Sequence, residues 1–376
     1  MIRLILCALC LFLGRLTASP LNLQVEAHAA LLINAETGAV LFEKEAHTPI
    51  YPASTTKLAT ALFFMDQKKI PLDQMVTVSR EAVHIESDGS SMGLLRGEVL
   101  NVEALLHGLL LVSGNDAANV LAEIASGTVG QFMQELNQYL QQIGCKESHF
   151  VNPYGYHHAE HVSTAADLAL IAQKVIQQPI LRSIAGKASY QKPKTNKQPS
   201  MELKQTNGLL KPGKYFYSKA IGLKTGRHSA SGNNLVAAAT HEERTLIAVV
   251  LGCETNAIRF SEAKKLFEAA FNEKKVIQQL LPIGGQYVKK LEGAKGPLKA
   301  ALAQNLIVSF YPAEKSKLKA YLSWETLSLP VRKGQKVGEI RAIDERGAVM
   351  GVSPLVALEE VKPTLWFTLK SWWNQL

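Results

Sequence analysis

Residues 51–64, YPASTTKLATALFF, place a hydroxyl and an ammonium group one helical turn apart at the start of an apolar run. Ser54 precedes Lys57 by three residues, so both side chains share one face of the helix that the apolar run predicts. Two interpretations are open. In one, Ser54 caps the helix and Lys57 reaches solvent. In the other, Lys57 takes the proton of Ser54 and makes it a nucleophile.

The first residues of the chain have the pattern of an export signal. They read MIRLILCALCLFLGRLTASP, with Arg3 before an apolar run over 4–13 and small residues after it. Such a run is too short to cross a bilayer, and the order of charge, apolar core and small residues is typical of a secretory signal peptide. We therefore predict a signal peptide over 1–27, with the cut falling within 18–28.

Export changes the interpretation of the four cysteines. Cys7 and Cys10 leave with the signal peptide, whereas Cys145 and Cys253 remain in the mature chain. These two either form a disulfide or are separate buried thiols. No group of Cys and His residues has metal-ligand spacing, and YHHAEH at 156–161 matches no zinc pattern, so we expect neither metal nor cofactor.

The chain is basic, with a formal net charge of +9, of which Arg3 and Arg15 belong to the predicted signal. Within 182–227 lysines recur and Glu202 is the one acidic residue. This stretch is either an ordinary solvated surface or a surface that attracts an anionic polymer or a membrane. An exported chain without a nucleic-acid-binding motif is not expected to bind nucleic acid.

The apolar residues of the first half indicate strands followed by helices. Residues 29–44 alternate around Glu-Thr-Gly, which predicts a hairpin. Residues 100–125 have helical spacing on both sides of Ser-Gly-Asn at 113–115, so two helices with a loop between them are expected. Another amphipathic helix is predicted over 163–176, capped by its Ser or Thr.

Strand patterns return after this helical region. Three runs with short turns between them predict an antiparallel meander over 218–226, 233–240 and 244–252. A helix is expected from Arg259 to about Phe271. Strands, then helices, then strands and a final helix indicate one α+β domain, an antiparallel sheet flanked by helices with a helical subdomain, over 28–274.

From about Lys275 onward the pattern is different. Short alternating runs separated by Gly and Pro, at 287–312 and 327–343, predict a small all-β domain over 275–361.

The end of the chain, PTLWFTLKSWWNQL at 363–376, is aromatic. One face of the helix predicted over 362–376 carries Leu365, Trp366, Leu369, Trp372, Trp373 and Leu376. This helix is too short to span a bilayer. It either lies in the membrane interface or docks on the protein, and we favour a membrane anchor.

Two further short motifs lie in a suitable context. Ser113 and Asn115 form Ser-x-Asn in the expected loop between helices, and Lys224-Thr225-Gly226 ends an expected strand. Ser-x-x-Lys alone is expected about once by chance in a chain of this length. The combination of the three motifs in these places carries more weight than any one of them.

This combination resembles the serine penicillin-recognising enzymes. Within them it is similar to low-molecular-weight penicillin-binding proteins, the serine-type D-alanyl-D-alanine carboxypeptidases of peptidase family S11. The resemblance covers the whole mature chain and includes GSSMGLLRGE at 89–98, GLKTG at 222–226 and GNNLVAAAT at 232–240. The residues that match the family motifs are Ser54, Lys57, Ser113, Asn115, Lys224, Thr225 and Gly226.

The resemblance implies a β-lactamase/transpeptidase-like catalytic domain followed by the β domain and the tail. It implies removal of the terminal D-alanine from peptidoglycan stem pentapeptides through an acyl-enzyme on Ser54, with acylation by penicillins and other β-lactams as inhibitors. The expected location is the periplasmic face of the inner membrane, with peripheral anchoring.

Elementary chemistry gives the catalytic motif residues consistent roles. Burial and the nearby Lys224 cation would lower the pKa of Lys57 until its amine serves as the base for Ser54. Ser113 would relay a proton to the leaving amine, with Lys224 holding charge nearby. Asn115 would orient Lys57 and donate to the substrate amide.

The remaining residues are expected to bind substrate. The N–H groups of Ser54 and Arg227 would form the oxyanion hole, and an extended substrate would lie against the strand that contains Gly226. Thr225 and Arg259 are suited to the free carboxylate. Arg259 has this role from the resemblance, because without it a surface position at a helix start is the better interpretation.

Two stretches depart from the family pattern, and a further residue, Asp167, matches it with two alternative roles. NPYGY at 152–156 has Tyr154 where relatives often carry His, which leaves the activation of the deacylating water open. Arg227 and His228 replace His-Thr after Lys-Thr-Gly. Asp167 matches a carboxylate of relatives, and its alternative role is to complement the dipole of its helix.

Other functions were weighed. A β-lactamase needs a deacylation base, for which Glu160 is the sole candidate in a poorly fitting context, and such enzymes lack a β domain and tail. A D,D-endopeptidase uses the same residues. An idle wall-binding module has no need of Ser54, Lys57 and Lys224.

Overall fold

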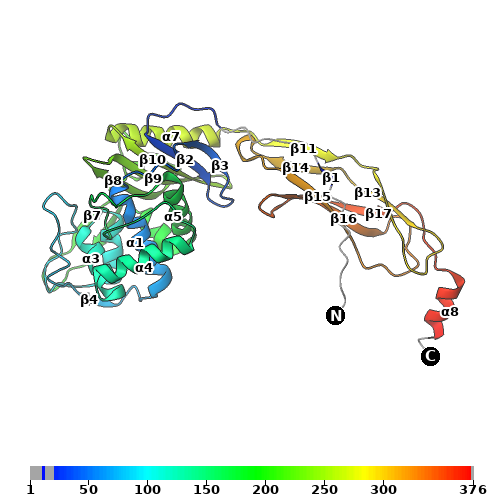
Figure 1. The fold of residues 1–376 in the computed structure, drawn as a ribbon, viewed down its shortest axis with the longest axis horizontal. Coiled ribbons are helices and arrows are strands. Elements are labelled where there is room, and N and C mark those ends of the chain that lie inside the picture. Colours follow the sequence, from blue (N-terminus) through cyan, green and yellow to red (C-terminus); the bar gives the residue numbers. More distant parts are fainter. Residues whose placement is uncertain (1–10, 13–20, 374–376) are drawn as a thin grey trace. The chain divides into compact units, whose positions relative to one another are not determined.

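The computed structural model describes residues 11–12 and 21–373, and the side chains of 21–369. The chain divides into two units, Pro20–Asn272 and Glu273–Leu376, the second together with the N-terminal residues (Figure 1). Most of the predicted signal peptide, and the last three residues of the predicted tail helix, lie outside the described residues.

A five-stranded antiparallel sheet forms the centre of the first unit. Its order is β3-β2-β10-β9-β8. The strands are β2 (Ala29–Asn34), β3 (Val40–Lys44), β8 (Ala220–His228), β9 (Gly232–His241) and β10 (Arg244–Cys253). The predicted hairpin and meander are therefore confirmed, and β8 is an edge strand whose outer side is free for a peptide.

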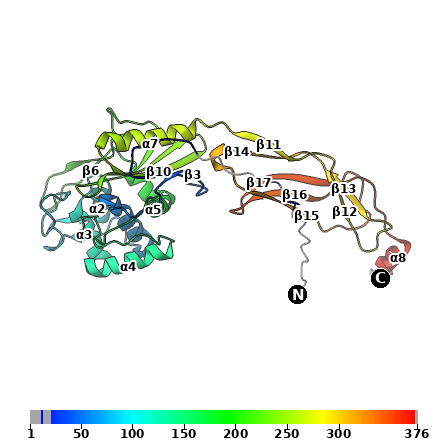
Figure 2. The same ribbon diagram turned by 45° about the horizontal axis from the view of Figure 1, so that its top comes forward.

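Helices cover both faces of this sheet, which explains why β2 begins with five apolar residues and is buried along its whole length. Helix α7 (Asn256–Phe271) packs on β9 and β10, and α5 (Ala165–Gln177) packs on β10 and β2. Figures 1 and 2 show α7 on the opposite side of the sheet from α5 and the helical subdomain. Helix α7 begins three residues before the predicted Arg259, because Thr255 caps it through the Ile258 N–H.

The helical subdomain holds the Ser-x-x-Lys and Ser-x-Asn motifs. Ser54 lies in a 3-10 turn, Ala53–Thr56, and α1 (Lys57–Phe63) follows, continued by a π-helical turn over Phe64–Lys68. The α-helix expected near Ser54 thus starts at Lys57. The other helices are α2 (Val102–Leu110), α3 (Asn115–Ser126), α4 (Val129–Gln142) and α6 (Pro179–Ala185).

Short elements complete this unit. They are the hairpin of β4 (Met75–Thr77) and β5 (Val99–Asn101), the hairpin of β6 (Ser189–Lys192) and β7 (Met201–Lys204), and a 3-10 turn over Gly208–Leu210. Buried apolar residues of the two hairpins pack in the same core as α1. Every residue of α1 is buried, Lys57 included.

The second unit is built of strands. A sheet of order β1-β15-β16-β17-β13-β12 contains β1 (Leu11–Phe12), β12 (Gln286–Lys289), β13 (Leu298–Leu302), β15 (Leu318–Trp324), β16 (Lys336–Asp344) and β17 (Val349–Ala357). A separate pair joins β11 (Val276–Leu281) to β14 (Leu306–Phe310), and a 3-10 turn spans Pro312–Glu314. Alternate residues of β14 are buried in a core with Val337, Ile340 and Leu355.

The last described element is α8 (Leu365–Trp373). Its Phe367 ring lies against Gly293, whereas Leu365, Trp366 and Leu369 are exposed. Among the described residues, no helix combines the length and the apolar character needed to cross a bilayer.

Candidate active site

The local fold gives Ser54 a constrained position. Ala53, directly before it, has a positive φ of 49°, a conformation that side chains other than glycine rarely adopt. The Thr56 hydroxyl donates to the Ala53 carbonyl at 2.9 Å. A Cβ atom on Gly155 would lie 1.9 Å from the same carbonyl, so only glycine lets this loop approach the turn so closely.

Lys57 is buried directly behind Ser54. Its Nζ lies 3.0 Å from Ser54 Oγ, 2.8 Å from Asn115 Oδ1 and 2.8 Å from the Tyr154 carbonyl. The Lys57 side chain is 0% exposed. Burial, and then the charge of Lys224, hold the pKa of Lys57 well below its usual range. Of the two interpretations of Ser54 and Lys57, the geometry excludes the one in which the amine reaches solvent.

Ser113 and Lys224 are also buried. Ser113 has a positive φ of 66°, and its Oγ has no hydrogen-bond partner among the described residues. Lys224 Nζ donates to the Thr225 carbonyl at 2.9 Å. Burial, and then the Arg259 charge, lower the pKa of Lys224 to about 7.

Gly226 allows β8 to lie against the turn that contains Ser54. A Cβ atom at this position would be 2.7 Å from the Pro52 carbonyl oxygen and 3.2 Å from the Ser54 nitrogen. A side chain would therefore push the edge strand away from the backbone N–H of Ser54. This close approach is what an oxyanion hole shared by the turn and the strand requires.

Thr225 belongs to β8, and Arg259 of α7 lies under this strand. Arg259 Nη1 donates to the carbonyls of Gly226 at 2.9 Å and Asn234 at 3.1 Å, and burial lowers the pKa of Arg259 to about 10. The Thr225 hydroxyl donates to Thr206 Oγ1 at 2.9 Å. Arg259 is thus mainly buried against backbone rather than at a helix surface.

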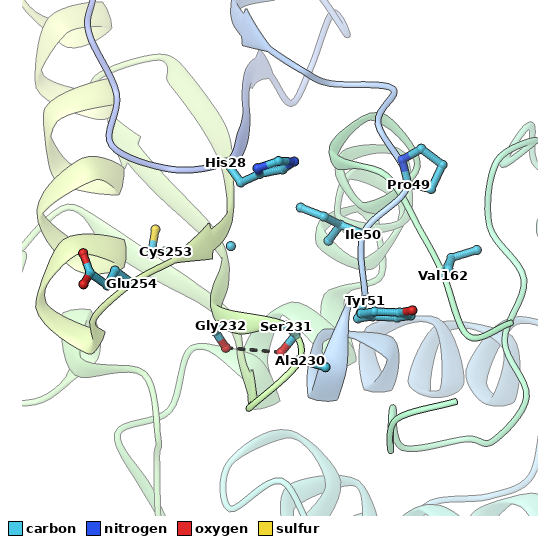
Figure 3. Close-up of a pocket in the computed structure, with 11 residues that line it drawn as sticks. His28, Pro49, Ile50, Tyr51, Val162, Ala230, Ser231, Gly232, Cys253 and Glu254 are labelled. Atoms are coloured by element: carbon cyan, nitrogen blue, oxygen red, sulfur yellow. Dashed lines mark hydrogen bonds between the residues drawn. The ribbon is translucent and has the colours of Figure 1, made fainter. Parts of the chain in front are cut away.

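A narrow pocket opens at Ser54. Arg227 lines it together with Asn115 and Tyr154, and the remaining wall is formed by 88–90 and by 155–156 with His228. Arg259 does not line it. A larger hollow of about 610 Å³ lies elsewhere in this unit, where His28 points toward Pro49 and Ile50 (Figure 3). None of the predicted site residues lines that hollow.

Asp116 fixes the loop that follows residues 88–90 in the wall of the Ser54 pocket. Its carboxylate accepts hydrogen bonds from the N–H groups of Met92 at 2.8 Å and Leu94 at 2.9 Å, and from the Ser91 hydroxyl at 2.6 Å. The stretch GSSMGLLRGE is therefore attached to the first turn of α3, beside Asn115. The analysis of the sequence missed Asp116, although an acidic residue at a helix start next to Ser-x-Asn was a usable signal.

His161 was missed as well. Its Nδ1 accepts from the Val151 N–H at 3.1 Å, so its Nε2 donates to Thr56 Oγ1 at 2.9 Å. Burial, and then His149, lower the pKa of His161 to about 3, so the ring is neutral. His161 lies in YHHAEH, which had been considered only as a metal pattern. Through Thr56 it supports the Ala53 carbonyl, one residue before Ser54.

Other residues that were considered lie apart from Ser54. The Asp167 carboxylate accepts from the Glu147 N–H at 2.9 Å and the Ser148 hydroxyl at 2.7 Å, and so organises the loop before α5. Glu160 is exposed and does not line the Ser54 pocket. Cys145 and Cys253 are free buried thiols, which resolves the two alternatives left open for them.

Comparisons with known proteins agree with this geometry. A family model described as D-alanyl-D-alanine carboxypeptidase matches residues 15–255. D-alanyl-D-alanine carboxypeptidase DacF of Bacillus subtilis is 31% identical over 350 residues, covering 91% of this chain and 87% of the relative. DacA of Haemophilus influenzae is 32% identical over 330 residues, covering 84% of this chain and 81% of that relative.

Solved structures extend the likeness to both units. Penicillin binding protein 6B from Escherichia coli has a TM-score of 0.66 and 29% identity, covering 90% of this chain and 97% of its own. The Streptomyces K15 DD-transpeptidase has a TM-score of 0.62 and 31% identity, covering 66% of this chain and 98% of its own. These likenesses confirm the predicted fold class. The chain belongs to the D-alanyl-D-alanine carboxypeptidase family.

Proposed function

We propose that this protein is a serine-type D,D-carboxypeptidase that removes the terminal D-alanine of peptidoglycan stem pentapeptides through an acyl-enzyme on Ser54. The observation that carries the proposal is the buried Lys57 amine, 3.0 Å from Ser54 Oγ. Its pKa is held well below the usual range by burial and by Lys224. A hydroxyl becomes a useful nucleophile when such a base stands within hydrogen-bond reach.

In the acylation step the uncharged Lys57 amine takes the proton of Ser54 as Ser54 Oγ bonds to the carbonyl carbon of the penultimate D-alanine. The N–H groups of Ser54 and Arg227 stabilise the oxyanion. The peptide C–N bond then breaks as the Ser113 hydroxyl gives its proton to the leaving D-alanine amine and takes one back from the protonated Lys57, which leaves Lys57 uncharged for deacylation. Ser113 Oγ suits this relay because it has no partner among the described residues.

Lys224 keeps the charge of the site in balance. With a pKa of about 7, it carries a substantial share of positive charge at neutral pH. That charge disfavours protonation of the Lys57 amine and so keeps the base uncharged.

Deacylation requires water to attack the ester on Ser54. Tyr154 replaces the His of relatives, and burial, and then the charge of Glu86, raise the pKa of its phenol, so this side chain cannot serve as the base. Lys57 is the basic group nearest to Ser54 Oγ among the described contacts. We infer that Lys57 acts as base in both half-reactions.

Recognition of the free carboxylate relies on the cationic side of the pocket. Arg227 lines the pocket. Thr225 belongs to β8, and Arg259 lies under this strand and donates to the Gly226 carbonyl. A penicillin presents a carboxylate and an acylated amide in a similar arrangement, so it would acylate Ser54 and leave slowly.

The proposed location is the periplasmic face of the inner membrane. A predicted signal peptide and a cell-wall substrate both require export. The exposed Leu365, Trp366 and Leu369 of α8 suit a helix that lies in the membrane interface.

One experiment tests the function. The full chain is labelled with a fluorescent penicillin, and D-alanine release is followed from a synthetic peptide ending in D-Ala-D-Ala, with Ser54→Ala as control. Slow loss of the label together with D-alanine release is expected. Rapid loss of the label would indicate a β-lactamase, release only from cross-linked peptide an endopeptidase, and an unlabelled wild-type protein would remove Ser54 as the nucleophile.

A further inference from the structure

Tyr154, which departs from the family pattern, touches the proposed base with two of its groups. Its carbonyl lies 2.8 Å from Lys57 Nζ, and its ring centroid lies 5.8 Å from the same atom. The phenol hydroxyl of the same residue donates to Glu86 Oε1 at 3.1 Å. Tyr154 is therefore held at both ends, by the amine and by a carboxylate.

Glu86 is placed to act on the same amine. Its Oε2 is buried and has no hydrogen-bond partner among the described residues. A Cβ atom on Gly89 would lie 3.7 Å from Glu86 Oε2 and 2.7 Å from Asn115 Nδ2. The carboxylate and the amide that binds Lys57 thus flank one glycine, in the wall of the Ser54 pocket.

The charged groups around Lys57 come from several elements. Lys224 on β8 lowers the pKa of Lys57, and Asp116 on α3 and Glu86 raise it, while burial has the largest effect and lowers it. His161, on the loop that holds Tyr154, is neutral because its pKa is about 3. Glu86 is thus one of two carboxylates that oppose the removal of the Lys57 proton.

We propose that Tyr154 and Glu86 form a positioning pair for the base, in which the phenol fixes the Tyr154 carbonyl against the Lys57 amine and the carboxylate sets the charge that this amine meets. The inference rests on the proposed role of Lys57. It assigns two separable effects to the pair: orientation to Tyr154 and charge to Glu86.

The two effects predict different kinetic changes. Glu86→Gln keeps an oxygen acceptor for the phenol but removes the negative charge. The pKa of Lys57 then falls further, so its amine stays uncharged at lower pH. The acid limb of the acylation profile should move to lower pH by about one unit, as a charge several ångströms away gives in a partly buried site.

Tyr154→Phe leaves the carboxylate charge in place and removes only the hydrogen bond that fixes the ring. The position of the acid limb should therefore stay close to that of wild type. The plateau rate of acylation should fall about tenfold, because the base is less well oriented.

The control is another tyrosine–carboxylate bond of the same unit. Tyr139 donates to Asp66 Oδ2 at 2.9 Å, and neither residue is among those that line the Ser54 pocket. Tyr139→Phe removes an equivalent hydrogen bond away from the base. The acid limb of its acylation profile and its plateau rate of acylation should therefore match those of wild type.

The experiment measures the second-order rate of labelling by a fluorescent penicillin across pH for the full chain and these three variants. The proposed positioning pair would be refuted by a wild-type pH profile for Glu86→Gln. Equal plateau rates of labelling for Tyr154→Phe and Tyr139→Phe would refute it as well. If Glu86→Gln does not fold, the comparison of the two phenylalanine variants decides. A Ser54→Ala chain that is still labelled would instead refute the proposed function.

Discussion

Lys57 and Lys224 are two lysine side chains without solvent contact in one site. Each is 0% exposed. Burial of a lysine favours its neutral form, and mutual repulsion strengthens that preference. Burial of the two amines is therefore what makes an uncharged base available to the proposed reaction at neutral pH.

His161 is a further buried titratable residue, and through Thr56 it stabilises the turn that contains Ser54. It is buried in neutral form because both ring nitrogens are occupied, one accepting from Val151 and one donating to Thr56. The unfolded chain exposes this ring at its ordinary pKa near 6.5, whereas the native chain holds the pKa near 3. Between these values only the unfolded chain binds the proton, so the free energy of unfolding falls as the pH falls.

We therefore predict that His161→Gln flattens the acid sensitivity of the protein. At pH 4.5 the wild type should lose about 2–3 kcal/mol relative to neutral pH through this residue, and the variant should not. The measurement is the urea midpoint of the helical circular dichroism signal at pH 7 and 4.5, because most helices lie in Pro20–Asn272. The exposed His158→Gln is the control and should keep the wild-type difference. Equal differences for both variants would contradict the prediction.

At the scale of elements, the site depends on a short turn meeting an edge strand. The 3-10 turn Ala53–Thr56 presents the Ser54 N–H, and β8 reaches it because Gly226 has no side chain. Loops on the other side are fixed by buried ionic groups. Lys192 of β6 lies 2.8 Å from Glu98, and both side chains are 0% exposed. This pair joins the hairpin of β6 and β7 to the end of GSSMGLLRGE.

We predict that Lys192→Met destabilises the protein by about 3–5 kcal/mol, because it leaves the Glu98 carboxylate buried without its counter-charge. Lys204→Met in the same hairpin removes an exposed pair with Glu202, and should cost less than about 0.5 kcal/mol. Urea unfolding measures both. The double variant Lys192→Met with Glu98→Leu should recover most of the loss, and a double variant as unstable as the single one would contradict the explanation.

At the scale of the whole molecule, the proposed chemistry belongs to Pro20–Asn272, since every contact of the site lies within it. Among the described residues, those of the second unit, which contains α8, take no part in the site contacts named above. The Streptomyces K15 DD-transpeptidase matches 66% of this chain and is itself covered to 98%, so a relative without the remaining third forms the same fold. We propose that the second unit serves membrane anchoring through α8.

We predict that deleting the residues after Pro363 releases the protein from vesicles of bacterial phospholipid in a flotation assay. Within the full chain, Trp366→Ser should weaken binding, since Trp366 is 76% exposed on α8. Ile277→Ser is the matched control, because Ile277 is 73% exposed on β11 and should not affect flotation. A truncated chain that still floats with the vesicles would show that α8 is not the anchor.

The sequence by itself determined the order of strands and helices and the motif residues. Period-two and helical patterns follow from which faces are buried, so the hairpin, the meander and the helices around Ser113 were predictable. The spacing of Ser54 and Lys57 likewise required them to share one helical face. Such patterns depend only on residues that are close in sequence, so they can be recognised without the tertiary structure.

Only the tertiary structure decided what surrounds the base. Tyr154 contacts Lys57, Glu86 contacts Tyr154, and His161 contacts Thr56, and no periodicity encodes these contacts between separate segments. The depressed pKa of Lys57 is a property of that packing, since an identical side chain in water keeps its proton.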